Sequence, residues 1–542
     1  MKKLLSVVLC ILATAGFAFA NGSKDKDTAS GNNDLVGGKF TTTKNITVEI
    51  YDRSNDGGSN PEDNFYTSFI KEGMLRDHNV AVTFKRVPRW TEVEVLNNLL
   101  AAGDAPDICV TYSYPTIQTY GNMGGVLDMS SYLAKYKKEL PNLYKLLGDV
   151  NVNWNKDPET GRIWAVEALL FNNMRTNTFV REDWLKKLNL KEPTNLKEFE
   201  AMLKAFKDNA KVLLGNNADK MIPFSIGVDV GWRADGLTTS NVPEKLTDKD
   251  MWINGFDDRR LLWPNYKEGI RTLNKWYNEG LVWKDFALYA IGTKDEDNLI
   301  KAGYVGSFIH NWDYPYRDGE QGIHANLQKL VGPEAGYIAV NCFKNNAGKY
   351  TRYLSAPVDR KVFFPSTNKE PVASLLYLDW ISKFENRKFL QIGESGVTHV
   401  PQDDGSVKTL SAKGTDKIQN AGQNIDYTIT INGLDLGDQT LNAKSVALGY
   451  AGVDKRYIEK AFAIQKKDFR ITANFNVGEI TSETGMGPAL QEKRNNMLVQ
   501  SIFAKPAQFD SVFDNGMKDY LSSGGQAIID ERKAKYEVFF KK

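Results

Sequence analysis

The chain has 542 residues, of which 42% are apolar, 25% charged and 11% aromatic. A chain of this length and composition can bury large cores and is expected to fold as more than one compact lobe, which excludes a disordered protein and a small disulfide scaffold. The 69 Lys and Arg side chains nearly balance the 67 Asp and Glu side chains. Because no long basic run is present, nucleic acid is not an expected partner.

The N-terminal residues have the pattern of an export signal. Two lysines precede an apolar run, and residues 18–20 read Ala-Phe-Ala, the small-residue motif of a signal-peptide cleavage site. We expect residues 1–20 to be a signal peptide and residues 21–43, rich in Gly, Ser, Asn and Lys, to be a flexible tether. The mature chain is therefore expected outside the inner membrane, in the periplasm or at the cell surface.

Three cysteines are present. Cys10 lies within the signal and lacks the small residue that normally precedes a lipid-modified cysteine, so a lipid anchor is the less favoured alternative. Cys109 and Cys342 both lie in apolar, strand-like runs. We expect two buried free thiols there, although a disulfide is chemically allowed in an oxidising compartment.

Strand and helix patterns alternate from residue 46 onward. Apolar side chains alternate over 46–50 and again over 80–84, whereas 65–69 between them has helical spacing, and 107–110 is a further apolar run. This alternation implies an α/β fold with a parallel, right-handed, doubly wound sheet.

The rest of the chain continues in the same way with more helix. Apolar side chains recur every three or four residues over 199–206 and 266–277, which predicts two amphipathic helices. Residues 397–430 are polar and partly alternating, which suggests a hairpin insertion. The stretch from Pro488 onward is predicted to be helical.

Five short segments resemble motifs of one family in their order and spacing. They read GDAPDI at 103–108, AVEAL at 165–169, REDWL at 181–185 followed by PT at 193–194, AG at 302–303 followed by HNW at 310–312, and GESGVTH at 393–399. Together they resemble the family 1 extracellular solute-binding proteins of ABC importers, especially its longer oligosaccharide-binding branch.

The resemblance implies a two-lobed periplasmic-binding-protein fold of type II, with a hinge and a ligand cleft between the lobes. Three crossings are expected near 164–169, 358–365 and 473–479. They assign 44–165 plus 362–472 to an N-terminal lobe and 166–361 plus 473–542 to a C-terminal lobe. Such a protein captures a carbohydrate, expected to be an oligosaccharide, by lobe closure and delivers it as a monomer to the membrane permease subunits of an ABC transporter.

No metal or cofactor is expected. Some relatives of the long branch carry a DxNxNG calcium loop, but the corresponding residues 214–221 read LGNNADKM, in which only Asp219 is acidic. Hard cations need several oxygen ligands, so we predict no structural calcium.

A sugar ring presents polar hydroxyl edges and an apolar face, so a sugar site combines aromatic plates with planar hydrogen-bonding groups. Trp312 follows the apolar run 305–309 and has polar neighbours, which favours a stacking role in the cleft over a core position. Trp232 lies where the relatives form the cleft wall of the second lobe, although a packed loop anchor fits equally well.

Glu167 is the strongest polar candidate, because an unpaired carboxylate inside an apolar segment costs several kcal/mol. It is predicted to bind ligand hydroxyls, as the resemblance implies, and a structural salt bridge at the hinge is the alternative. His399 lies in the segment that resembles a cleft loop, and an exposed histidine without function is its alternative.

Further candidates follow the ends of predicted strands, where open α/β sheets bind their ligands. Asp52 and Arg53 follow the first strand, and Tyr112 and Tyr114 follow the third. Solvated turn residues are the alternative for each. The nature of the ligand stays open, since Arg53, Arg175 and Arg233 could pair with uronates but a neutral sugar fits as well.

The alternative function is a secreted carbohydrate-active enzyme, a glycosidase or a polysaccharide lyase. Glycosidases need two carboxylates about 5–10 Å apart, and a chain with 67 acidic residues can nominate many pairs. The sequence contains no GxSxG, HExxH or Walker motif, so we expect no catalytic residues and favour a binding protein. A ligand sensor that serves a membrane receptor would need the same cleft.

Overall fold

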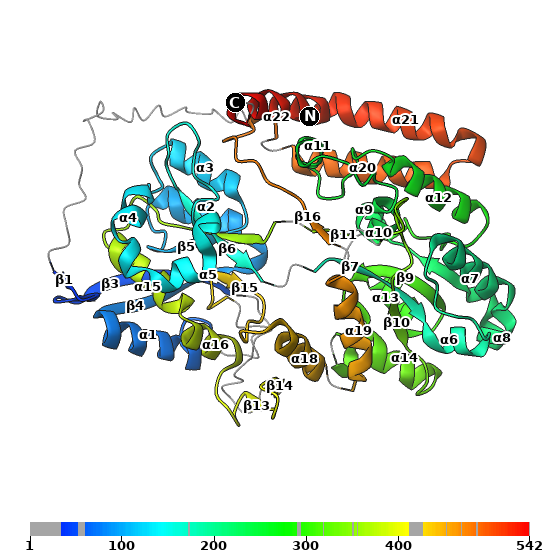
Figure 1. The fold of residues 1–542 in the computed structure, drawn as a ribbon, viewed down its shortest axis with the longest axis horizontal. Helices are drawn as coiled ribbons and strands as arrows, with labels where there is room; N and C mark the ends of the chain where they lie inside the picture. The colour runs from blue at the N-terminus through cyan, green and yellow to red at the C-terminus, as the bar shows by residue number, and fades with distance from the viewer. Residues whose placement is uncertain are drawn as a thin grey trace, which may run out of the picture.

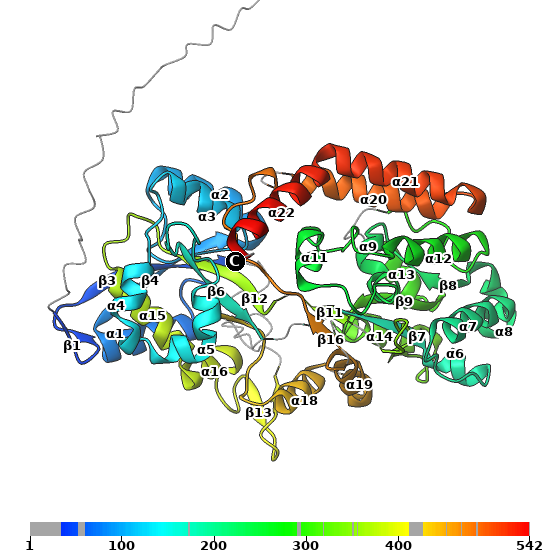
Figure 2. The ribbon, with the colours of Figure 1, turned by 45° about the horizontal axis from the view of Figure 1, so that its top comes forward.

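The computed structural model describes residues 34–52, 60–171, 174–289, 294–317, 319–349, 352–354, 356–410, 426–450, 452–467, 469–483 and 486–540. The expected signal peptide and Arg53 lie outside these residues. Figure 1 shows two α/β lobes side by side, as the family resemblance predicted, and Figure 2 shows the same arrangement from a second direction.

The first lobe is built on a mixed sheet. β3 (Lys44–Asp52) pairs in parallel with β4 (Val80–Pro88), and a bridge from Val48 to Ile108 joins β3 to the chain that enters β5 (Cys109–Thr111). From β5 the sheet continues through β12 (Val358–Phe363) and β6 (Ala165–Leu170) to β15 (Ile431–Asn432). The predicted alternation is confirmed, because Ile46, Val48 and Ile50 are buried in the first core.

Helices cover this sheet on both faces (Figure 1). Asn64 caps the first helix by accepting hydrogen bonds from the N–H groups of Tyr66 and Thr67. The helices of the first lobe are α1 (Phe65–His78), α2 (Glu92–Ala102), α3 (Tyr114–Asn122), α4 (Ser130–Lys135), α5 (Pro141–Val152), α15 (Pro371–Ser382) and α16 (Phe384–Ile392).

The second lobe has its own four-stranded sheet in the order β10 (Tyr337–Val340), β7 (Thr176–Arg181), β9 (Val305–Asn311), β8 (Ile222–Ser225). Its first helices are α6 (Glu182–Lys187), α7 (Leu196–Asp208), α8 (Ala210–Leu214), α9 (Val230–Arg233), α10 (Asp235–Thr239) and α11 (Asp248–Ile253). They are followed by α12 (Tyr266–Asn278), α13 (Asp295–Lys301), α14 (Ile323–Val331), α20 (Gly487–Phe503), α21 (Phe509–Tyr520) and α22 (Gln526–Phe540).

The helices predicted from periodicity are present in this lobe. The apolar stripe of α7, Phe199, Met202, Leu203 and Phe206, is buried in the second core. In α12, Tyr266, Ile270 and Leu273 are buried in the same core. The predicted C-terminal helices are confirmed as α20, α21 and α22.

The expectation of a parallel sheet is confirmed for β3, β4 and the chain at Ile108, which run parallel to one another, but both lobes also contain antiparallel pairs. β12 runs antiparallel to both β5 and β6, and β7 runs antiparallel to both β9 and β10. β12 enters the first sheet from the second lobe, so it runs opposite to β6, which leaves the first lobe by the same edge. A return crossing between two lobes therefore introduces a reversed strand.

Two segments pack elsewhere than expected. Residues 35–40, assigned to the tether, form a hairpin of β1 (Leu35–Val36) and β2 (Lys39–Phe40), and Phe40 is 2% exposed in the first core. α19 (Lys455–Gln465), which was assigned to the first lobe, packs in the second core. Its last residue, Gln465, donates a hydrogen bond to the Thr176 carbonyl of β7. The remaining lobe boundaries stay a proposal.

The predicted hairpin insertion is confirmed by the antiparallel pair β13 (His399–Pro401) and β14 (Val407–Thr409). It lies beside α18 (Gln439–Gly449) at the lower edge of the molecule in Figure 1. A short parallel pair, β11 (Arg352–Leu354) and β16 (Phe469–Ile471), lies where two of the crossings meet the second lobe. No helix among the described residues is long and apolar enough to span a membrane.

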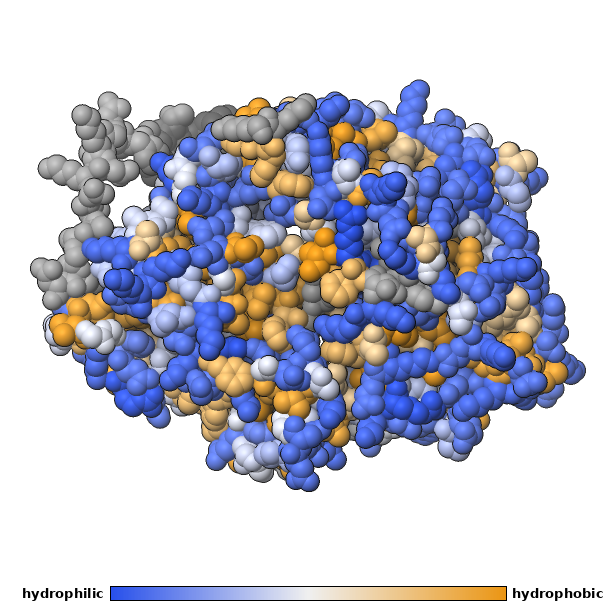
Figure 3. All heavy atoms as spheres, viewed as in Figure 1, coloured by the Kyte–Doolittle hydropathy of each residue, from blue (hydrophilic) through white to orange (hydrophobic). Residues whose placement is uncertain are grey.

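The surface of the molecule is polar over most of the face drawn in Figure 3. Hydrophobic residues gather on this face toward its middle, between the two lobes. Cys109 and Cys342 are buried free thiols.

Candidate functional site

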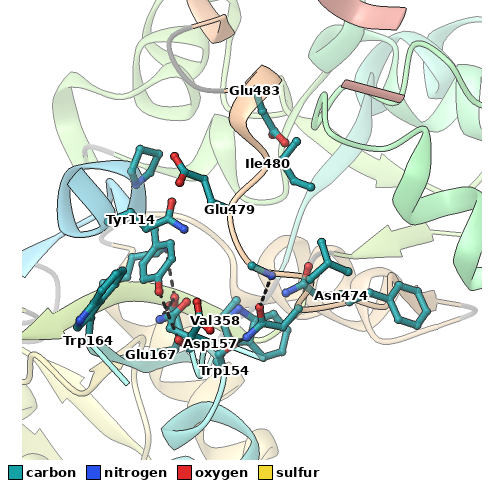
Figure 4. Close-up of a pocket in the computed structure, with 18 of the residues that line it drawn as sticks. Tyr114, Trp154, Asp157, Trp164, Glu167, Val358, Asn474, Glu479, Ile480 and Glu483 are labelled. Atoms are coloured by element: carbon teal, nitrogen blue, oxygen red, sulfur yellow. Dashed lines mark hydrogen bonds and ion pairs between the residues drawn. The ribbon is translucent and has the colours of Figure 1, made fainter. Parts of the chain in front are cut away.

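A cavity of about 480 Å³ lies where the crossings between the lobes meet, and Figure 4 shows it in detail. We call it the hinge cavity. The first lobe contributes Tyr114 of α3 and Glu167 of β6, whereas the second lobe contributes Trp252 of α11 and Arg532 of α22. The crossing segment 474–480 forms a further wall. Its volume lies within the range of about 300–1,000 Å³ that is typical of small-molecule sites.

An adjoining cavity of about 320 Å³ extends the hinge cavity along the second lobe. The two cavities share five residues, Trp154, Trp252, Val358, Asn474 and Arg532. The combined groove therefore has room for more than one sugar ring.

Glu167 is 1% exposed and lies at the inner wall of the hinge cavity. Its Oε1 accepts a hydrogen bond from Asn155 Nδ2 at 2.9 Å and lies 3.7 Å from Lys361 Nζ. Its Oε2 is buried and has no hydrogen-bond partner among the described residues. Burial raises the pKa of Glu167 to about 7, against the opposing effects of the Lys361 charge and the Asn155 hydrogen bond.

The expected alternatives for Glu167 are therefore both represented in its geometry. One oxygen takes part in a structural contact at the hinge, while the other is a buried acceptor at the cavity wall without a partner among the described residues. Such an acceptor is costly unless a donor reaches it, and a ligand hydroxyl would supply that donor.

Aromatic side chains line the same cavity. Tyr114 begins α3, whose N-cap Ser113 accepts a hydrogen bond from the Thr116 N–H, and the Tyr114 hydroxyl donates to the Asn155 carbonyl at 3.3 Å. Trp164 packs directly against Gly121 of α3, where an added Cβ would lie 2.7 Å from the indole. The small residue at 121 therefore sets the position of Trp164 beside Tyr114.

Sequence reasoning missed other members of this site, namely Trp154, Asn155, Trp252, Lys361, Glu479 and Arg532. The segment that contains Trp154 reads NVNWN, so this tryptophan has the polar neighbours that singled out Trp312. The same criterion could have identified it. No local signal marks Arg532, which reaches the cavity only through the packing of α22.

The crossing segment is held to both lobes. Asn476 Nδ2 donates to the Trp154 carbonyl at 2.9 Å on the side of the first lobe. On the other side, Glu531 of α22 accepts hydrogen bonds from the N–H groups of Thr481 and Ser482. This wall of the cavity is thus positioned by contacts from the two sides of the hinge.

Trp232 lines a different hollow, with a volume of about 400 Å³, within the second lobe. Two guanidinium groups lie near its ring, with Arg175 at 4.6 Å and Arg259 at 5.1 Å from the ring centroid. The parallel rings of Trp283 and Tyr289, 5.7 Å apart, lie in the same hollow. Both expected roles of Trp232, cleft wall and packed anchor, fit this position.

Trp312 does not lie where we expected it. It is 9% exposed, packs edge-on against Phe462 of α19 at 5.8 Å and lines none of the described cavities. Its polar neighbours serve internal contacts, because Asp313 accepts hydrogen bonds from Arg317 and from the Tyr450 hydroxyl. The inference from those neighbours was therefore wrong, and Trp312 is a core residue of the second lobe.

The other predicted residues also lie away from the described cavities. His399 is 6% exposed, and its Nδ1 lies 3.0 Å from the Ile392 carbonyl oxygen. The Tyr112 ring is covered by the Arg89 guanidinium at 4.2 Å, and Asp52 ends β3. Of the eight residues predicted from the sequence, the structure thus brings Glu167 and Tyr114 together in one cavity. Arg53 lies outside the described residues.

No group of three or more His, Cys, Asp or Glu side chains that could hold a metal ion occurs in the part of the chain that the structure describes. Asp219 lies in a short 3₁₀ segment, η3 (Gly215–Lys220), between α8 and β8.

Comparison with known proteins identifies homologues. No protein-family model matches the chain. The polygalacturonan/rhamnogalacturonan-binding protein YtcQ of Bacillus subtilis is 24% identical over 494 residues, which span 85% of this chain and 86% of YtcQ. Lipoprotein LipO of the same organism is 27% identical over 238 residues, or 41% and 42% of the two chains. The fructooligosaccharide ABC transporter substrate-binding protein FusA of Streptococcus pneumoniae is 24% identical over 276 residues, or 45% and 47%.

Solved structures share the fold. The human-milk-oligosaccharide-binding solute-binding protein of Bifidobacterium longum infantis aligns with a TM-score of 0.63 and 16% identity over 92% of this chain and all of its own. FusA of S. pneumoniae in complex with kestose aligns with a TM-score of 0.61 and 15% identity over the same shares. The resemblance predicted from the short motifs and the two-lobed fold is confirmed. YtcQ and FusA are named as binding proteins and LipO as a lipoprotein, and none of the three names states a catalytic activity.

Proposed function

We propose that this chain, a homologue of the ABC-type sugar-binding proteins, captures an oligosaccharide between its lobes and delivers it to the permease subunits of an ABC transporter. It would act outside the cytoplasm, in the periplasm or at the cell surface, as a monomer and without catalysis. Because one homologue is named as a lipoprotein, attachment through Cys10 remains an alternative to a free protein.

The observation that carries this proposal is the unpaired Oε2 of Glu167 within a cavity lined by aromatic rings. A sugar hydroxyl donates to that oxygen, while the apolar face of a ring lies against Tyr114 or Trp154. Both interactions form only when a sugar is bound, so each of them favours the bound state.

Residues from both lobes and from the crossings line the hinge cavity, so a ligand there gains contacts that depend on how close the lobes lie. A ligand that contacts both lobes stabilises the closed arrangement by its differential affinity for that state. The closed form then docks on the permease.

The test is a thermal-shift screen against plant, algal and host oligosaccharides, followed by calorimetry with each ligand that binds. The expected result is a tight ligand that is recovered unaltered and a smaller radius of gyration with ligand in small-angle scattering. Shortened products would indicate an enzyme instead. Failure to bind any oligosaccharide would refute the proposal.

A variant connects binding to the hinge cavity. Glu167→Ala should weaken binding about tenfold or more, since a hydrogen bond to a charged group contributes about 1.5–3 kcal/mol. Glu139→Ala is the matched control, because this carboxylate is exposed and lines none of the described cavities. Equal affinities of the two variants would place the ligand elsewhere.

A further inference from the structure

The charged side chains that line the hinge cavity are unbalanced. The lining contains four carboxylates and two cations. The carboxylates are Asp157, Glu167, Glu479 and Glu483, and the cations are Lys361 and Arg532. What a charged ligand would meet depends on which of these groups are already engaged within the protein.

Arg532 is fully engaged. Its Nη2 donates to Glu483 Oε2 at 2.8 Å, and its Nε donates to the same oxygen at 3.3 Å. Its Nη1 donates to the Trp252 carbonyl at 2.7 Å, and the guanidinium lies 4.9 Å from the Trp252 ring centroid. A ligand carboxylate would have to displace Glu483 to reach the paired donors of this guanidinium.

Lys361 is also engaged. Its Nζ donates to the Asp359 carbonyl at 2.9 Å and lies 3.7 Å from Glu167 Oε1. The Lys361 charge therefore partly balances the charge of Glu167, and Lys361 does not form a separate anion site.

Two carboxylates of the lining, Asp157 and Glu479, form no ion pair with another described residue, although the Arg162 charge acts on Asp157 and Lys535 Nζ donates to the backbone carbonyl of Glu479. Asp157 accepts hydrogen bonds through Oδ1 from the N–H groups of Glu159 and Thr160, and although burial opposes it, these bonds hold its pKa below the usual value. Asp157 is therefore an anion at neutral pH. The Glu479 carboxylate makes no hydrogen bond or ion pair with another described residue, and Figure 4 shows it on the crossing segment opposite Glu167.

Two of the three arginines that were candidate partners for uronates are paired as well, and the third, Arg53, lies outside the described residues. Arg175 Nε donates to Asp235 at 2.7 Å, and Arg233 Nη2 donates to Glu296 at 2.7 Å. In the adjoining cavity, Arg260 donates to Asp235 at 2.7 Å. These guanidinium groups therefore resemble Arg532 in having internal carboxylate partners.

We infer that the hinge cavity selects oligosaccharides that carry no carboxylate groups. The inference rests on the proposed function and specifies the substrate class of that same site. Neutral hydroxyls can donate to Glu167, Asp157 and Glu479, whereas a uronate would face Asp157 and Glu479 with no unengaged cation in the cavity lining to balance its charge.

This substrate class differs from that of the relative YtcQ, whose name describes binding of polygalacturonan and rhamnogalacturonan. At 24% identity the ligand of that protein need not be shared. The charge of the hinge cavity argues that this chain recognises a different sugar.

Matched ligand pairs test the inference on the full mature protein. The pairs are oligogalacturonides and their carboxyl-reduced counterparts, xylo-oligosaccharides with and without glucuronate, and mannuronate oligomers and mannan oligomers. Calorimetry at low and at moderate salt gives the affinity of each member. In each pair that binds, we expect the neutral member to have the higher affinity by about tenfold or more, because the uronate carboxylate is repelled by the nearby carboxylates of the cavity. This difference in affinity should shrink as the salt concentration rises.

The double variant Asp157→Asn/Glu479→Gln isolates the two carboxylates, since Asn can still accept the N–H bonds of Glu159 and Thr160. It should reduce the preference for neutral members about tenfold, whereas Glu139→Gln should leave it unchanged. An unchanged preference in the double variant, or tighter binding of the uronate members by the wild type, would overturn the inference and leave the proposed function standing. Absence of binding to every sugar would overturn both.

Discussion

Replacing Glu167 by glutamine should change how the stability of this protein depends on pH. Burial raises the pKa of Glu167 from 4.5 to about 7. The folded protein therefore retains a proton that the unfolded chain releases between these two values. The contribution of Glu167 to stability is therefore most favourable below pH 4.5, falls as pH rises through this window and is constant above it. The loss is about 1.36 kcal/mol for each pH unit of the window, or about 3 kcal/mol in all.

Glutamine keeps the shape of the side chain but carries no titratable proton. We expect the free energy of unfolding of Glu167→Gln, relative to that of the wild type, to rise by about 3 kcal/mol between pH 4.5 and pH 8. Urea unfolding followed by tryptophan fluorescence at several pH values measures this difference. The exposed control Glu139→Gln should run parallel to the wild type. Parallel curves for Glu167→Gln would refute the raised pKa of this carboxyl.

Two further substitutions test the placement of aromatic rings. Trp312→Ala should lower the free energy of unfolding by about 3–5 kcal/mol, as a truncated core tryptophan does, and leave oligosaccharide affinity unchanged, which chemical denaturation and calorimetry measure. Retained stability with lost affinity would return Trp312 to the ligand. Gly121→Ala should displace Trp164 because the added Cβ would lie 2.7 Å from its ring, and should cost about 1–3 kcal/mol of stability and weaken ligand binding. Gly487→Ala, where the Cβ has open space, is the control, and equal effects of the two would contradict this packing.

Local periodicity was sufficient for the individual elements. The alternation in β3 and the apolar stripes of α7 and α12 matched their structures, because a strand or helix repeats its buried positions every two or every three to four residues. Glu167 was identifiable for a related reason, since a carboxylate within an apolar run must find a partner or remain costly.

The same reasoning failed where distant residues satisfy a polar side chain. Asp313 suggested an open site beside Trp312, but the Tyr450 hydroxyl, 137 residues further along the chain, donates to it. His399 likewise lies 3.0 Å from the carbonyl oxygen of Ile392, the last residue of α16, which precedes the hairpin. The direction of β12 depended on its return from the other lobe, which no local pattern records.

By itself, the sequence determined the strands, the amphipathic helices and the need of one hinge carboxylate for a donor. Only the tertiary structure decided which charges meet around that carboxylate. Arg532 offers a ligand no free edge of its guanidinium because Glu483, 49 residues earlier, already pairs with it. Asp157 and Glu479 line the cavity without forming an ion pair to either cation of the lining. Such pairings depend on how remote segments pack, whereas periodicity depends only on near neighbours along the chain.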